Sequence, residues 1–198
     1  TLDRSSAASD VYKRQVLLGE ILDVLYYNYD RIDFVDSPVD LGFECPLDLH
    51  CTYSRDQILA ALDFMKPGTV REGTKYLLDK KTDVHFVTLN KAEKDYSPTT
   101  MYEDYSINEV LFHWQSQSTT SQSSTTGQRY MNHRSMGVRE LLFVREFKSG
   151  KLGAALYTFL GLADFLSVNG SKPMNITWRL HEPIPAKYLR KTNKLVVG

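Results

Sequence analysis

The residues best suited to chemistry lie on the two sides of a polar tract in the middle of the chain. The stretch FHWQSQSTTSQSSTTGQRYMNHR, residues 112–134, places Trp114 before and Tyr130 after a segment rich in Gln, Ser and Thr. Aromatic rings stack on nucleobases, amides hydrogen-bond to base edges, and hydroxyl groups hold phosphates. These residue types therefore predict a surface that binds nucleic acid, with an exposed base held against the rings.

The predicted contacts combine rings, amides, imidazoles and cations. They are Trp114, Gln115, Gln117, Gln128, Arg129, Tyr130, Asn132, His133, Arg134, Arg139 and Lys148. Tyr102 and Tyr105 are two further rings that could stack on a base. In the opposing interpretation, the aromatic residues belong to the hydrophobic core and the polar tract is only a mobile loop.

Charge is distributed unevenly although the formal net charge of the chain is zero. Residues 16–110 hold 9 Lys and Arg against 18 Asp and Glu, whereas residues 111–198 hold 12 against 4. No acidic residue lies between Leu111 and Arg139. This asymmetry predicts an anionic partner for the C-terminal half, most commonly nucleic acid, or an attraction between the two halves.

Sequence patterns of several enzyme classes are missing. There is no GxxxxGK[ST] phosphate loop, no GxSxG elbow and no His/Cys cluster at zinc spacing. Glu146 and Lys148 form a Glu-x-Lys pattern like the one that ends the metal-binding strand of many nucleases, but a solvent-facing strand end explains so short a pattern better. We therefore expect no catalytic residue, metal or cofactor in this part of the protein.

Cysteine use and hydropathy predict a cytoplasmic protein. Cys45 and Cys51 are too few for a disulfide framework and fit no zinc motif, so we expect reduced thiols. No apolar run approaches the roughly 20 residues that cross a membrane, and the first residues lack a signal-peptide pattern.

Hydrophobic periodicity predicts helices first and strands later. Residues 16–29 have helical spacing, and Ser54 with Gln57 forms a capping box before a second helix that ends by Pro67. Period-two patterns then predict strands at residues 83–89, 109–117, 138–147, 155–168 and 174–180, with turns at 149–153 and 169–173. The predicted fold class is α+β, an N-terminal helical segment followed by a mainly antiparallel curled sheet or pseudobarrel.

Three segments are expected along the chain. Residues 1–15 resemble a sequencing-adapter artefact, because DVYKRQ at 10–15 looks like a translated transposon-end adapter. Residues 16–80 are interpreted as a helical linker region, and residues 81–198 as a β-rich target-recognition domain.

Long blocks of the sequence, in order, resemble one known family. They are PLDLHCTYSRDQILAAL (46–62), VTLNKAEKDYSPTTMYEDYSINEVLFHWQSQS (87–118), GQRYMNHR (127–134), LLFVREF (141–147), YTFLGLADF (157–165) and KPMNITWRLHEPIPAKYL (172–189). From about residue 40 to 189 the chain resembles the uncharacterised C-terminal domain of bacterial superfamily-two, DEAD/DEAH-type, helicase-like proteins.

The resemblance implies a DNA-recognition domain and not the ATP-driven helicase core. Some family members are modification-dependent type IV restriction enzymes with a phospholipase D-like nuclease domain, in which this domain is thought to recognise methylated cytosine in DNA. The implied function is a non-catalytic DNA-recognition module. Its partners would be DNA, the helicase core of the same chain and a second copy of itself in a homodimer, while ATP and Mg²⁺ would belong to the parent protein. The alternative is a module that docks on the parent helicase core.

Overall fold

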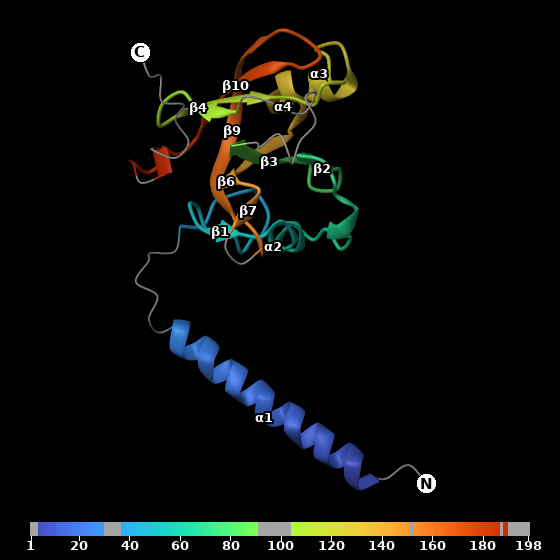
Figure 1. The fold of residues 1–198 in the computed structure, drawn as a ribbon. Helices are drawn as coiled ribbons and strands as arrows, with labels where there is room; N and C mark the ends of the chain where they lie inside the picture. Colours follow the sequence, from blue (N-terminus) through green and yellow to red (C-terminus); the bar gives the residue numbers. More distant parts are fainter. Residues whose placement is uncertain (1–3, 30–36, 91–103, 151–152, 187, 190–198) are drawn as a thin grey trace. The chain divides into compact units, whose positions relative to one another are not determined.

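The computed structural model describes residues 4–29, 37–90, 104–150, 153–186, 188 and 189. The chain forms two compact units, Thr1–Asp36 and Ser37–Gly198 (Figure 1). The first contains helix α1 (Arg4–Tyr29), which confirms the helix predicted at 16–29 and begins earlier than predicted. Its apolar side chains are exposed to solvent, as the 57% exposure of Leu18 and the 47% exposure of Ile21 show.

A mixed, mostly antiparallel sheet of eight strands forms the framework of the second unit. Its order is β2-β3-β6-β9-β10-β5-β4, with β1 also paired to β9. The strands are β1 (Thr52–Tyr53), β2 (Thr74–Leu77), β3 (Thr82–Asn90), β4 (Tyr105–Ser106), β5 (Leu111–Gln115), β6 (Arg139–Phe147), β9 (Tyr157–Asn169) and β10 (Asn175–Leu180). In Figure 1 the long strand β9 runs through the unit between β6 and β10.

The predicted α+β class is confirmed, and the predicted curled sheet or pseudobarrel is wrong. The sheet is open, with β2 and β4 at its two ends. Alternating side chains predict that a strand exists, but they do not predict which strands pair, so closure could not be derived from the pattern. The pairing of β3 with β6 is parallel, whereas the other described pairs are antiparallel.

Strand β6 is buried on both faces because a hydrophobic cluster lies on each. Leu141 and Phe143 belong to the first core cluster, and Leu142 and Val144 belong to the second. The period-two pattern predicted at 174–180 is confirmed, since its alternate residues Met174, Ile176, Trp178 and Leu180 are all buried in the second cluster. Each face of the sheet at β6 thus has its own apolar packing.

Residues 37–80 pack into the same unit as the later strands. Helix α2 (Arg55–Ala61) begins with the predicted capping box, in which the Ser54 hydroxyl accepts a hydrogen bond from the Gln57 amide. The helix ends before the short 3-10 turn η1 (Pro67–Thr69) and buries Ile58 in the first cluster. The compact unit therefore begins at residue 37, whereas we predicted the domain boundary at 81.

Two smaller predictions concern the turn at 149–153 and the two cysteines. The turn at 149–153 is a hairpin, in which β7 (Ser149–Gly150) pairs with β8 (Gly153–Ala154). Cys45 and Cys51 are not joined by a disulfide. Within the described residues, no helix has the length and hydropathy to cross a membrane.

The polar tract is largely ordered, so its interpretation as a mobile loop is wrong. Its second part forms helix α3 (Thr125–Met131), followed by α4 (His133–Met136). The Ser124 hydroxyl caps α3 by accepting from the Gly127 amide, and it donates to the Ser121 carbonyl oxygen at 2.7 Å. Ser and Thr are unfavourable inside helices but favourable at their N-caps. A segment with the composition of a linker can therefore still begin a helix.

Replacing Gly127 with Ala is expected to destabilise the protein by about 1–3 kcal/mol, the usual cost of overpacking. A Cβ at this position would lie 2.0 Å from the Ser121 carbonyl oxygen and 2.9 Å from Met174 Sδ, so the backbone must move. Urea unfolding measures the effect. Gly68→Ala is the control, because nothing lies within 4 Å of its added Cβ, and equal stabilities of the two variants would contradict the prediction.

Candidate nucleic-acid interface

A pocket of about 630 Å³ lies where the C-terminal ends of β3 and β6 meet the start of β2 and the end of β5. Parallel pairing brings the ends of β3 and β6 to the same edge, where Thr88 is the register partner of Arg145. The volume is in the range of small-ligand sites, about 300–1,000 Å³. Its principal side chains are the aromatic Phe86, Trp114 and Tyr157, the basic Arg55, Arg71, Arg145 and Lys148, the amides Gln115 and Gln117, and the acidic Glu72 and Asp104.

The two rings that flank the polar tract belong mainly to the core. Trp114 is 5% exposed and Tyr130 is 1% exposed, and their ring centroids are 5.5 Å apart. The prediction that both rings are open to a ligand is therefore wrong: Tyr130 does not line the pocket, and Trp114 lines it with very little exposed surface. The cause is the alternation along β5, which points Phe112 and Trp114 together into the second core cluster.

The two predicted amides at the pocket already hold hydrogen bonds. Gln115 Nε2 donates to Asn175 Oδ1 at 2.6 Å. Gln117 Nε2 donates to the Glu72 carboxylate and to Thr74 Oγ1. These bonds orient the amides at the pocket, and a bound base edge would have to share or exchange them.

Arg55 and Arg145 are pocket residues that the sequence prediction missed. Both are half-buried, and both contact Tyr157: Arg55 Nη2 lies 3.4 Å from Tyr157 Oη, and Arg145 Cζ lies 4.4 Å from the centre of that ring. The signal that could have revealed Arg145 is its position directly after the apolar run LLFV (141–144), which is buried on both faces of the strand. A cation there must find polar partners at the strand end.

Three predicted cations are engaged elsewhere. Arg129 makes two hydrogen bonds to Asp83, at 2.5 and 3.0 Å, and this pair joins the basic half of the chain to the acidic half. Arg134 is ion-paired with Asp164. Arg139 donates to the Lys80 carbonyl oxygen and lies over the Phe43 ring. Part of the charge asymmetry thus serves attraction within the chain, the alternative that the sequence left open.

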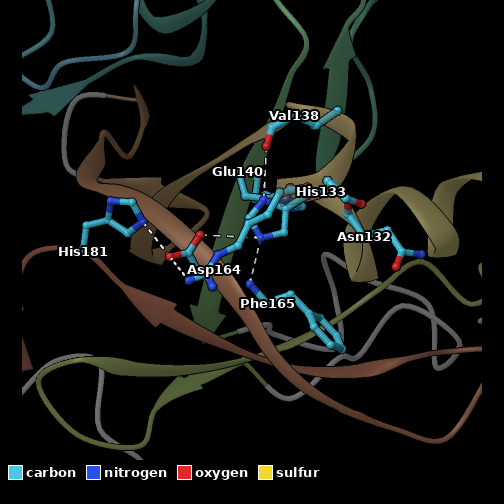
Figure 2. A network of polar contacts seen from close by, with 10 residues as sticks. Asn132, His133, Val138, Glu140, Asp164, Phe165 and His181 are labelled. Carbon is cyan, nitrogen blue, oxygen red and sulfur yellow. Dashed lines mark hydrogen bonds and ion pairs between the residues drawn. The ribbon is translucent and has the colours of Figure 1, made fainter.

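Figure 2 shows the polar network in which His133 lies. His133 Nε2 accepts a hydrogen bond from the Phe165 amide at 3.0 Å, so the ring proton is on Nδ1, which donates to the Val138 carbonyl oxygen at 3.1 Å. Burial lowers the pKa of His133, which keeps the ring neutral. The imidazole therefore joins α4 to Val138, directly before β6, and to β9. The prediction that it hydrogen-bonds to a base has no support from its position.

Asp164 forms the exposed side of the same network (Figure 2). Its carboxylate accepts from Arg134 and from His181 Nε2, the latter at 2.8 Å. The Arg134 hydrogen bond, followed by that of His181, lowers the pKa of Asp164 to about 2. Asp164 is therefore ionised at neutral pH and compensates the charge of Arg134.

The remaining predicted residues are not gathered at one place. Tyr105 stacks on His113 with ring centroids 4.7 Å apart, whereas Tyr102 lies outside the described residues. Glu146 lines a different pocket, of about 290 Å³, so the Glu146–Lys148 pattern does not converge on one site. In the described part of the chain, no group of three or more His, Cys, Asp or Glu side chains could hold a metal ion.

The pocket therefore unites only part of the predicted set. It brings together Trp114, Gln115, Gln117 and Lys148. The predicted contacts outside its lining are Gln128, Arg129, Tyr130, Asn132, His133, Arg134 and Arg139. Of these, the exposed Asn132 and Gln128 hydrogen-bond to each other at the end of α3.

Comparison with protein families places this pocket inside a recognised domain. A family described as "Domain of unknown function (DUF3427)" matches residues 47–191, which include every residue of the pocket lining. The comparison with curated proteins gave no match.

Proposed function

Because the chain belongs to the DUF3427 family of domains of unknown function, we propose its function from its pocket: a non-catalytic DNA-recognition module that holds a nucleotide of the DNA there. The resemblance to the C-terminal domain of helicase-like proteins supports a parent protein of the helicase or type IV restriction kind. It also supports methylated DNA as the preferred target.

The observation that carries this proposal is the combination of side chains in one pocket. Four cations face two carboxylates, which leaves a formal excess of two positive charges. Aromatic side chains and two amides line the same space. A nucleotide offers the matching parts, since its phosphate is anionic, its base has apolar faces, and its base edge carries donors and acceptors.

A second candidate is docking on the parent helicase core. Helix α1 favours it, because large apolar side chains such as Leu18, Ile21 and Leu25 are about half exposed along the helix. Such side chains are typical of a surface that another protein covers. Gel filtration of the chain with and without the core distinguishes this function from DNA binding.

DNA binding by this chain is expected to weaken as salt rises, because the cations of the pocket replace counterions on the phosphates. Fluorescence anisotropy with a labelled duplex, methylated or unmethylated at cytosine, measures this between 50 and 200 mM KCl. Arg71→Gln should weaken binding to both duplexes about tenfold and lower the salt slope by about one. Gln117→Ala should instead reduce the preference for the methylated duplex and leave the salt slope unchanged.

Arg179→Gln is the matched control, because Arg179 is exposed and lies outside the pocket lining. It should bind like the unmodified protein. A DNA affinity that does not depend on salt concentration would contradict a DNA site at the pocket. An equal loss of affinity in Arg71→Gln and Arg179→Gln would contradict it as well.

A further inference from the structure

Two guanidinium groups flank Tyr157 at one end of the pocket. Arg55 Nη2 lies 3.4 Å from the Tyr157 hydroxyl, while the Arg145 guanidinium lies over the ring of the same residue. Phe86 packs edge-on against Tyr157 with centroids 5.4 Å apart, and Arg55 Cζ lies 5.2 Å from the Phe86 centroid. The two cations are thus held around one pair of aromatic rings.

Both side chains are fixed in place by neutral oxygen atoms. Arg55 Nη1 donates to the Val70 carbonyl oxygen at 2.9 Å. Arg145 Nε donates to Thr88 Oγ1 at 2.9 Å, and its Nη1 donates to the Ala155 carbonyl oxygen at 3.3 Å. Such anchoring removes most of the rotamer freedom that a long cation loses when it binds a ligand.

Neither guanidinium has a carboxylate partner among the residues that the structure describes, in contrast to Arg129 and Arg134. Within that part of the chain, each group uses two of its five N–H donors and keeps three for a ligand. Two half-buried cations near each other repel, and an anion between them removes that repulsion. The arrangement therefore has donors and charge in place for an anion.

We propose that Arg55 and Arg145 form a phosphate-binding site at the Tyr157 end of the pocket. A tetrahedral phosphate presents oxygens to two planar forks at once, whereas a carboxylate has only two oxygens to share between them. The site deepens the proposed function and rests on it for the identification of DNA as the source of the phosphate. The exposed Arg71 and Lys148 add positive charge at the same pocket.

The test is binding of inorganic phosphate, a deoxynucleoside monophosphate and a duplex oligonucleotide, each compared with chloride at equal ionic strength. Thermal unfolding and isothermal titration calorimetry give two independent readouts. We expect phosphate to raise the Tm of the unmodified protein, and Arg145→Gln and Arg55→Gln each to weaken phosphate binding at least tenfold. Arg71→Gln should weaken it less, and Arg179→Gln should leave it unchanged.

Arg55 and Arg145 also hydrogen-bond to neighbouring residues, so either substitution could lower stability by itself. The stability of each variant is therefore first compared with that of the unmodified protein by unfolding without phosphate. Arg145→Lys separates charge from geometry, since it keeps the charge and loses the fork, and we expect weak but measurable binding. Phosphate binding without DNA binding would support the site and contradict the proposed function. DNA binding that survives both Gln substitutions, or a phosphate affinity equal in Arg145→Gln and Arg179→Gln, would overturn the site.

Discussion

Replacing Asp83 with Asn is expected to lower the free energy of unfolding by about 3–5 kcal/mol, the usual cost of breaking a buried ion pair on one side. The side chain of Asp83 is 1% exposed and that of Arg129 is 13% exposed, so the substitution leaves a guanidinium with little access to water. Domains of this kind are stable by only about 5–15 kcal/mol, so the variant should be close to unfolding at 37 °C. Urea denaturation followed by circular dichroism measures the loss.

Two further variants show whether burial is the cause. Asp63→Asn breaks the 2.7 Å pair with Lys80, in which Asp63 is 79% exposed, and should cost less than about 1 kcal/mol. The double variant Asp83→Leu with Arg129→Met removes both charges and should recover most of the stability. If Asp83→Asn costs no more than Asp63→Asn, the pair does not hold β3 to α3 as described.

The stability of the protein is expected to fall on both sides of a weakly acidic optimum because of the pair formed by His85 and Glu140. Both side chains are 0% exposed, with His85 Nε2 at 2.6 Å from Glu140 Oε2. Burial lowers the pKa of His85 to about 3 and raises the pKa of Glu140 well above 4.5, so both groups are neutral in the folded protein. The other titratable groups that act on the pair are Arg129, which lowers the pKa of both residues, His133, which acts on His85, and Asp83, which acts on Glu140.

The signs follow from which state binds the proton. As pH falls from about 6.5 toward 3, the unfolded chain protonates His85 and the folded protein does not, so acid destabilises the fold. Above pH 4.5, the unfolded chain loses the Glu140 proton while the folded protein retains it, so base destabilises the fold. Each proton changes the free energy of unfolding by up to about 1.4 kcal/mol per pH unit. Between about pH 4.5 and 6.5 the two contributions have opposite signs and largely cancel.

Glu140→Gln tests the alkaline side of this profile. The Gln amide can donate to His85 Nε2 as the protonated carboxyl does, and it does not ionise. Chemical denaturation from pH 5 to 8.5 should show the unmodified protein losing stability above pH 6.5 while Glu140→Gln stays level. Glu182→Gln, at an exposed position, should follow the unmodified protein. Parallel profiles for all three proteins would show that Glu140 is ionised in the fold.

The elements of the fold were largely predictable because local rules determine them. The capping box at Ser54, the strand at Thr82–Asn90 and the inward face of β10 all follow from spacing that the structure confirms. Pairing was not predictable, because β3 joins β6 in parallel across a long separation in the sequence. A periodic pattern describes one strand at a time and does not identify its neighbour.

The candidate site was predictable only in part, for the same reason. Trp114 and Gln117 lie close together in the sequence and were predicted, whereas Arg55 reaches the pocket from helix α2, much earlier in the chain. Residue type also misled where burial decided the role. Tyr130 looks like a ring for stacking but is 1% exposed, and Arg129 looks like a phosphate ligand but pairs with Asp83.

The parallel pairing of β3 with β6 also bears on how the chain folds. Val84 lies beside Leu141, 57 positions later, and no tight turn can join neighbouring strands that run in the same direction. Closing so large a loop costs entropy before any contact repays it, which slows folding relative to a meander of hairpins. The centre of the sheet therefore cannot form until β6 has been synthesised. A nascent chain that ends before β6 leaves one edge of the apolar strand β3 unpaired and open to chaperones or to aggregation.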